Sequence, residues 1–383
     1  MHRSSTGVSS GIVIDVKKIR IGTAKSVPGR LTYGFFDGIE LPTGTADRLA
    51  VMIAQGTRDG PTFFLTANVH GNELTGVAVI HDVMTEELAK ELKGTVAAIP
   101  TVNPSALRLF QRTSEYGEPD PNRLFPEGKF AKRNEEDEEP KYPKPYEQIA
   151  SKIYAFIEKY GDFHLDFHNH TYRSLPYAII DRIFYDDEED KKNAVELSKK
   201  QEKMVDAFGA VTMADFPPKK YMKLKYHRSL SGSVLNNLRI PAFTVELGGN
   251  SVVLPDIVAG SVKGTRNVLR WADMLDSPKE KITEWEAPKH SGRIRRIEHP
   301  RSKHSGIIRF LVNPGDKIEK GQPVARITDI HGRPLGDGYI RTEHDGYVTV
   351  LNSKMTVYPN DPLGEIGIAD DADLVAPNPR LKD

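Results

Sequence analysis

The chain has 383 residues, 38% of them hydrophobic and 28% charged, and its 53 basic and 53 acidic side chains cancel. This composition is typical of a globular protein with two or three domains. A formal charge of zero argues against nucleic acid or an anionic membrane as the partner. The chain contains no cysteine, which excludes disulfides, thiolate metal ligands and a cysteine nucleophile.

Any metal must therefore be held by His, Asp and Glu side chains. The first residues lead into no apolar signal-peptide core, and no stretch reaches the roughly 18 apolar residues of a membrane span. We therefore expect a soluble, cytoplasmic protein.

The first part of the chain alternates between predicted strands and predicted helices. The expected strands are 47–56, 61–69, 96–100, 164–168 and 240–246, and the expected helices are 75–92, 147–159, 188–208 and 255–275. Residues 58–60 are interpreted as the turn between the first two strands, and Gly94 as the end of the first helix. Strands that alternate with helices indicate right-handed crossovers and a largely parallel sheet.

The later parts of the chain differ from this pattern in composition and in the spacing of apolar runs. Residues 134–145 are acidic and rich in proline, which is typical of a solvated loop. Short apolar runs separated by Gly-Asp turns follow a charged linker and predict a small β-sandwich or barrel. The predicted organisation is an N-terminal extension (1–44), an α/β domain with the candidate site (45–276), the linker (277–303), the β-rich domain (304–369) and a tail (370–383).

Two histidine-containing motifs stand at the ends of predicted buried strands. His70 and Glu73 follow the strand 61–69, and His168 ends the strand 164–168. In an open α/β sheet, ligands gather outside the carboxyl ends of the strands. Two His and one Glu are the protein ligands of many hydrolytic zinc sites, with the fourth position left for water. His164 and His170 share the strand parity of His168 and stay open as alternatives.

Two carboxylates would complete such a site. Glu246 ends the apolar run 240–246 and is followed by glycines that leave room for a substrate. We predict that it is the general base for a metal-activated water. Asp166 lies on the same strand face as His168, so we expect it to orient either this ligand or the wall of the active site.

An irregular segment between the two metal-ligand motifs contains Asn103, Arg112, Asn122 and Arg123. A planar guanidinium can bind a carboxylate through two parallel hydrogen bonds. A second arginine can stabilise the negative charge that develops on a scissile carbonyl oxygen. The segment therefore favours an anionic substrate.

Together, these motifs resemble the succinylglutamate desuccinylase/aspartoacylase family, which is related to the zinc carboxypeptidases. The matching stretches appear in the family's order and are 69–73, 103–104 with Arg112, 120–126, 166–168 and 244–248. They cover roughly residues 45–275. The resemblance implies an α/β fold of the zinc-carboxypeptidase type, with a mixed eight-stranded sheet flanked by helices and a β-rich C-terminal domain.

The resemblance also implies roles for the residues of the site. It implies one zinc ion per chain, held by His70, Glu73 and His168. It implies Glu246 as general base and acid, Asn122 and Arg123 at the substrate carboxylate, and Arg112 at the carbonyl oxygen. Pro121, where many members have an apolar residue such as Leu, and the insertion 134–145 depart from the family's pattern and leave the substrate open.

The C-terminal segment 312–324 resembles half of a biotinyl/lipoyl barrel-sandwich, a fold that carries its cofactor on a lysine at a hairpin tip. Here the tip falls near residues 328–333 and contains no lysine. Lys354 lies in the second half, away from this tip. We therefore predict a barrel-sandwich domain that is not a cofactor carrier.

The leading interpretation is a zinc-dependent amidohydrolase that removes an acyl group from an N-acyl amino acid or a similar small carboxylate. The alternative is a zinc carboxypeptidase that acts on short peptides with the same centre. A third interpretation is a non-catalytic scaffold that keeps the pocket. The expected partner is a small N-acyl molecule, with no nucleic acid and no membrane, and homo-oligomerisation is left open.

Overall fold

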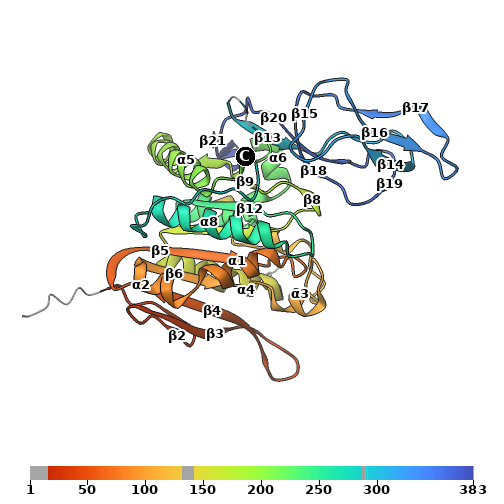
Figure 1. Cartoon of the computed structure of the whole chain (residues 1–383). Coiled ribbons are helices and arrows are strands. Elements are labelled where there is room, and N and C mark those ends of the chain that lie inside the picture. Colours follow the sequence, from red (N-terminus) through yellow and green to blue (C-terminus); the bar gives the residue numbers. More distant parts are fainter. Residues whose placement is uncertain (1–15, 132–141, 287, 289, 291, 383) are drawn as a thin grey trace, which may run out of the picture.

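The computed structural model describes residues 16–131, 142–286, 288, 290 and 292–382, so most of the predicted acidic loop lies outside the described residues. A sheet of 13 strands runs through the molecule, with helices packed on both of its faces (Figure 1). No helix of these residues combines the length and the apolar character needed to cross a bilayer.

Eight strands form the part of the sheet that positions the candidate site. In spatial order they are β3 (Arg30–Glu40), β4 (Ala46–Gln55), β6 (Lys93–Ile99), β5 (Arg58–Ala67), β7 (Phe163–His168), β12 (Ala242–Glu246), β9 (Tyr177–Ile180) and β11 (Val211–Ala214). The central strands β6, β5, β7 and β12 are parallel, and the neighbours β4 and β9 run antiparallel to them. This mixed eight-stranded arrangement confirms the predicted fold class.

Two helical layers bury the faces of this sheet. One layer contains α1 (Thr75–Val83), α2 (Glu86–Glu91), α8 (Pro255–Trp271) and the end of α5 (Glu188–Phe208); the other contains α4 (Pro145–Tyr160), α7 (Leu230–Ser233) and the start of α5. Strand β5 shows why both layers are needed. Its Phe63 and Leu65 pack into the first layer and Phe64 into the second, and all three are fully buried.

Three local predictions are wrong. Residues 58–60 begin β5, and the chain reverses just before them. The predicted helix 75–92 is two helices, because Thr85 interrupts it and caps α2 by accepting a hydrogen bond from the Leu88 amide at 3.1 Å. Gly94 does not end a helix: it lies in β6 with a φ of 76°, where a Cβ would sit 2.1 Å from the Pro61 carbonyl oxygen.

Segments predicted to lie outside the two domains also contribute strands. β3 comes from the predicted extension and pairs with β4. β13 (Ile294–Ile297) comes from the predicted linker and pairs with both β11 and β20 (Gly364–Ala369). β21 (Val375–Pro377) comes from the predicted tail and pairs with β10 (Ile183–Tyr185). The domain boundaries themselves stay a prediction.

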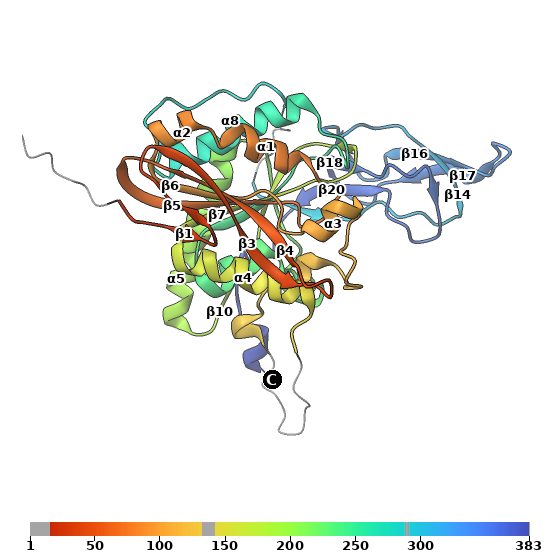
Figure 2. The ribbon, with the colours of Figure 1, turned by 90° about the horizontal axis from the view of Figure 1, so that it is seen from below.

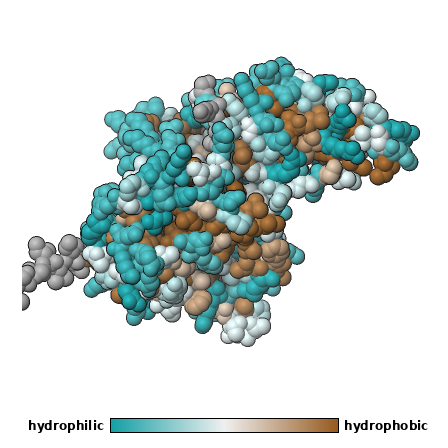
Figure 3. Space-filling model, viewed as in Figure 1, coloured by the Kyte–Doolittle hydropathy of each residue, from teal (hydrophilic) through white to brown (hydrophobic). Residues whose placement is uncertain are grey.

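The C-terminal strands form two groups. β14 (Gly306–Phe310), β16 (Pro323–Thr328), β17 (Pro334–Arg341) and β19 (Thr356–Val357) make a separate antiparallel sheet. It projects from the body as a lobe, on which polar and hydrophobic surface alternate (Figures 2 and 3). β15 (Lys317–Ile318) and β18 (Gly346–Leu351) extend the main sheet through β20. The predicted tip at 328–333 is the turn between β16 and β17.

The remaining elements are short. They are β1 (Arg20–Ile21), β2 (Ala24–Lys25), β8 (Arg173–Ser174), α3 (Pro104–Leu109), α6 (Pro218–Lys223) and the single-turn helices η1 (Pro121–Arg123), η2 (Gly128–Phe130), η3 (Tyr226–Arg228), η4 (Val234–Leu238) and η5 (Pro379–Lys382).

Arg182 ties the tail to the main sheet. Its side chain is fully buried and lies 3.1 Å from the Asp370 carboxylate. It also donates to the backbone carbonyls of Asp215 at 2.6 Å, Phe216 at 3.0 Å and Ala372 at 3.1 Å. A buried guanidinium is tolerated only when its donors are satisfied, and here they bridge segments about 190 residues apart in the sequence.

We expect Arg182→Ala to lower the free energy of unfolding by about 3–5 kcal/mol, because it leaves buried acceptors without a donor. Urea denaturation of the purified chain measures this change. Arg48→Ala is the matched control: Arg48 pairs with Asp37, both side chains are more than half exposed, and its loss should cost about 0–1 kcal/mol. Equal effects of the two substitutions would contradict the claim that Arg182 stabilises the fold by linking the tail to the main sheet.

Candidate metal centre

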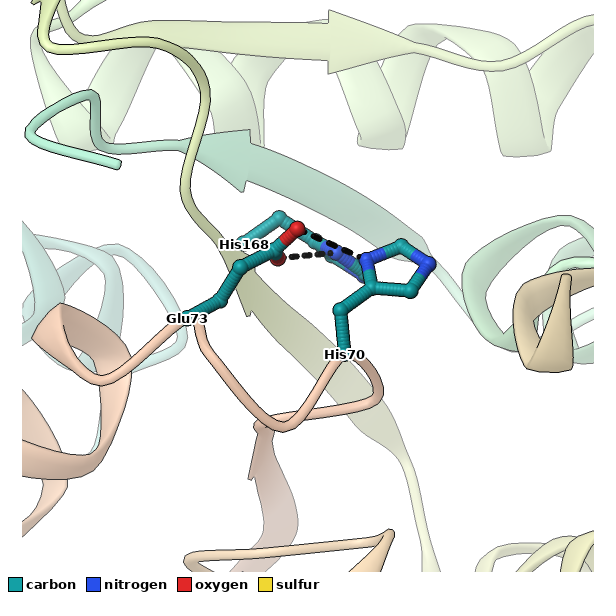
Figure 4. Close-up of side chains that lie close together, drawn as sticks. All are labelled: His70, Glu73 and His168. Carbon is teal, nitrogen blue, oxygen red and sulfur yellow. Dashed lines mark hydrogen bonds and ion pairs between the residues drawn. The ribbon is translucent and has the colours of Figure 1, made fainter. Parts of the chain in front are cut away.

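The side chains of His70, Glu73 and His168 converge at the carboxyl ends of β5 and β7 (Figure 4). The Glu73 carboxylate lies between the two imidazoles, with Oε1 2.8 Å from His70 Nδ1 and Oε2 3.0 Å from His168 Nδ1. One ligand atom from each residue lies within 4.8 Å of the other two, and all three residues are buried. The structure therefore brings together the three predicted metal ligands.

The turn that contains His70 and Glu73 is stabilised by hydrogen bonds from Asn68, at its own start. Asn68 follows β5 with a φ of 62°, a conformation that Asn adopts more readily than most residues. Its Nδ2 donates to the carbonyls of His70 and Glu73, both at 3.0 Å. Gly71 is required because a Cβ there would lie 1.9 Å from the carbonyl carbon of Ala106 in α3.

Each histidine is also oriented from its far side. Asp166 Oδ2 lies 2.9 Å from His168 Nε2, as strand parity predicts, and Asp120 Oδ1 lies 3.0 Å from His70 Nε2. These contacts leave both Nδ1 atoms turned toward Glu73. Metal-binding histidines usually have such a carboxylate on the second ring nitrogen. No contact between Asp120 and His70 was predicted, because Asp120 lies in an irregular segment 50 residues away and follows no predicted strand.

The electrostatics of the centre suit a cation. Burial alone would raise the pKa of the Glu73 carboxyl, but the flanking histidines outweigh it and hold that pKa well below its usual value. The pKa of Asp120 is likewise held low, against its own burial, by His70 and Arg112. Both carboxylates are therefore ionised at neutral pH. A buried His-Glu-His donor set with oriented rings is consistent with a metal-binding site.

The two alternative histidines lie elsewhere. His164 is fully buried beneath the centre, 2.8 Å from Thr66 Oγ1, and burial lowers its pKa to about 4 despite the nearby Asp166. His170 points toward the C-terminal strands, with Nε2 3.6 Å from Glu365. Neither belongs to the cluster formed by the other three residues.

A cavity of about 430 Å³ opens beside the three ligands and is also lined by Arg112, Asn122, Arg123 and Glu246. Arg112 lies 2.9 Å from Asp120 and 3.5 Å from Glu73. The Asn122 Nδ2 lies 3.3 Å from His168 Nε2. The structure therefore places the predicted site residues around one cavity, while their roles stay predictions.

Arg123, which is predicted to bind the substrate carboxylate, and Glu246, the predicted base, differ in the contacts of their side chains. Arg123 stacks on the Tyr226 ring at 3.9 Å and donates to the Leu224 and Asn122 carbonyls. Glu246, at the end of β12, has a buried Oε2 with no hydrogen-bond partner among the described residues. An acceptor of this kind beside a cavity is available for a proton or a ligand.

The residues of the opposite wall of the cavity, on the far side of β12 from the metal ligands, were not predicted from the sequence. They include Asp181, Asp215, Tyr226, Arg296 and Glu365. Asp181 and Asp215 directly follow β9 and β11, so each repeats the signal that identified Glu246, an apolar strand that ends in a carboxylate. Arg296 and Glu365 come from β13 and β20. These strands are far from β9 and β11 in the sequence but extend the same sheet in the fold.

Comparison with known proteins places this geometry in context. The family model of the succinylglutamate desuccinylase/aspartoacylase catalytic domain matches residues 59–272. The chain is also similar to the N-alpha-acetyl-L-2,4-diaminobutyric acid deacetylase of Halomonas elongata. The two are 24% identical over 320 residues, which cover 80% of this chain and 82% of that protein.

Solved structures share the fold at low identity. The succinylglutamate desuccinylase/aspartoacylase of Rhodobacter sphaeroides aligns with a TM-score of 0.66 at 19% identity, over 89% of this chain and 96% of that one. The ectoine utilization protein EutE (DoeB) of Ruegeria pomeroyi also gives a TM-score of 0.66 at 19% identity, over 88% and 95% of the two chains. Because the family model spans more than half of the chain, this protein belongs to the succinylglutamate desuccinylase/aspartoacylase family of deacylases, which are hydrolases that act on amide bonds.

Proposed function

We propose that this protein is a zinc-dependent amidohydrolase that removes the acyl group from a small N-acyl amino acid. One observation carries the proposal: the buried His70-Glu73-His168 cluster lines the same cavity as Glu246, whose Oε2 has no partner. The similarity to a deacetylase of an N-acetylated amino acid supports this class of substrate.

Zinc fits the donor set better than magnesium or calcium, because two of the three ligands are imidazoles, whereas magnesium and calcium prefer oxygen ligands. We propose one zinc ion per chain at this site. When bound, zinc polarises a carbonyl group and lowers the pKa of water.

The chain's own residues supply the proton transfers. Glu246 takes a proton from the attacking water and delivers it to the leaving nitrogen, a role that needs a carboxylate with a free oxygen. Arg112 stabilises the negative charge that develops on the carbonyl oxygen. Its position is set by Asp120, which contacts both Arg112 and the ligand His70.

Asn122 and Arg123 bind the carboxylate of the substrate in this proposal. The Asn122 side chain is fixed by the Leu230 amide, which donates to its Oδ1 at 2.9 Å. The Arg123 guanidinium is fixed by stacking on Tyr226. A clamp held in this way loses little side-chain entropy when a carboxylate binds.

The substrate class is tested by hydrolysis assays on the zinc-loaded chain. We expect release of amino acid from N-acetyl and N-succinyl amino acids, and little cleavage of dipeptides with a free amino group. Cleavage of peptides alone would replace the proposal with a carboxypeptidase. A chain that takes up no metal and cleaves neither class would be a scaffold.

Removal of a metal ligand should abolish zinc binding and hydrolysis together. We expect His70→Ala and His168→Ala to purify with only a small fraction of the wild-type zinc, as measured by elemental analysis. Asp120→Asn should weaken zinc affinity by about 10-fold to 100-fold, because it removes a partner that orients His70. His81→Ala, an exposed histidine on α1, is the control and should keep both properties.

Glu246→Gln should keep the metal and lose the reaction. The amide preserves the shape of the side chain but cannot accept the proton, so kcat should fall by about 10²-fold to 10⁴-fold. Zinc content and turnover are measured on the same sample. Full turnover by this variant would show that Glu246 is not the base.

A further inference from the structure

The wall of the cavity on the far side of β12 from the metal ligands is mostly acidic. Apart from the metal ligands, Glu246 and the arginines predicted to act on the substrate, the charged residues that line the cavity are Asp181, Asp215, Glu298, Glu365 and Arg296, with His170 beside them. Asp181, Asp215 and Glu298 directly follow β9, β11 and β13, whereas Arg296 lies in β13 and Glu365 in β20. This wall therefore contains four carboxylates and one guanidinium.

Most of these charges are already compensated. Arg296 lies 3.0 Å from Asp215 and 3.7 Å from Glu365. Glu298, at the rim, lies 2.9 Å from Arg301. The exception is Asp181. Among the described residues its carboxylate contacts no cation, and the hydrogen bonds that it accepts come from the hydroxyls of Tyr221 at 2.8 Å and Ser231 at 2.9 Å.

A second, independent observation concerns hydrogen bonding. Three buried atoms without a partner belong to residues that line this cavity, and all three are acceptor oxygens: Asn72 Oδ1, Asn169 Oδ1 and Glu246 Oε2. Asn169 is only 7% exposed, and its orientation is set because its Nδ2 donates to the carbonyl of Asn250. Buried acceptors need donors, so a ligand that fills the cavity is expected to present N–H or O–H groups to these oxygens.

We propose that the amino acid released by this enzyme carries a positively charged side chain, and that Asp181 is the residue that selects it. An ammonium group offers three donors and a full positive charge to a wall with one uncompensated carboxylate. An acidic side chain, by contrast, would be repelled by this uncompensated carboxylate. This inference rests on the proposed function and adds the substrate class.

The ionisation of Asp181 provides a signature of this role. Burial, together with the neighbouring Asp215, raises the pKa of Asp181 to about 7, and the hydroxyls of Tyr221 and Ser231 and the charge of Arg296 only partly oppose this shift. A cation and a proton therefore compete for the same carboxylate. Binding of a cationic substrate should weaken as the pH falls below about 7, whereas binding of a neutral one should not follow this titration.

The test compares three substrates of nearly equal size on the zinc-loaded, full-length chain at about pH 8. They are Nα-acetyl-L-ornithine, Nα-acetyl-L-norvaline and N-acetyl-L-glutamate, with cationic, neutral and anionic side chains. We expect kcat/KM for the ornithine derivative to exceed that for the norvaline derivative by about 10-fold to 100-fold, mainly through KM. The glutamate derivative should be the poorest. A preference for glutamate would overturn the inference.

Asp181→Asn should lower the ornithine-to-norvaline ratio of kcat/KM by at least about tenfold and remove its change between pH 6 and pH 8. Asp59→Asn, at an exposed position on β5, is the matched control and should leave the ratio unchanged. An unchanged ratio in Asp181→Asn would show that another group selects the substrate.

Calorimetric binding of the ornithine and norvaline derivatives to the Glu246→Gln chain separates the two proposals, because it needs no turnover. Tighter binding of the cationic compound supports the selection of a positively charged side chain by Asp181, even if hydrolysis fails. A failure of hydrolysis alone counts only against the proposed function. Equal binding of the two compounds overturns the assignment of Asp181.

Discussion

The structure of the site depends on one buried charge. The Glu73 carboxylate lies beneath the surface between two imidazoles, and an isolated charge in that place would be strongly unfavourable. Its compensation requires β5 and β7 to be neighbours, because each strand delivers one histidine. The backbone amide of Asn169 adds a donor at 3.0 Å. A metal ion held by His70, Glu73 and His168 would add positive charge to the compensation of this carboxylate.

The histidines that compensate Glu73 are themselves held by carboxylates, and these carboxylates are held by further side chains. Asp120 and Asp166 hold the outer nitrogens of the histidines, and Arg112 and Thr66 in turn contact these carboxylates. Each side chain fixes the orientation of the side chain that it contacts. A site assembled from four separated stretches of sequence thereby presents its donor atoms in one arrangement.

The grouping of His70, Glu73 and His168 could be predicted from the sequence because its signal is local. His70 and Glu73 follow one apolar run and His168 ends another, and parallel strands bring such ends to one edge of a sheet. The opposite wall was not predictable in this way. Arg295 and Arg296 fill the middle of β13 with charge, so the segment reads as a linker until Asp215 and Glu365 compensate Arg296 in the fold. The break between α1 and α2 was missed because the apolar spacing continues through Thr85, whereas the capping hydrogen bond ends the helix.

The continuity of the main sheet through β13 and β20 limits how the protein can be divided. A fragment that stopped at residue 276 would keep His70, Glu73, His168 and Glu246. It would leave β11 paired only with β9, as an exposed edge strand of the kind that invites aggregation. The fragment would also lose Arg296 and the contacts of β18 with the loop after His168, where Leu351 accepts from the Thr171 hydroxyl at 2.8 Å. The C-terminal strands thus contribute to the main sheet and to the lining of the cavity, and gene truncations or fusions at this junction would separate parts that share both.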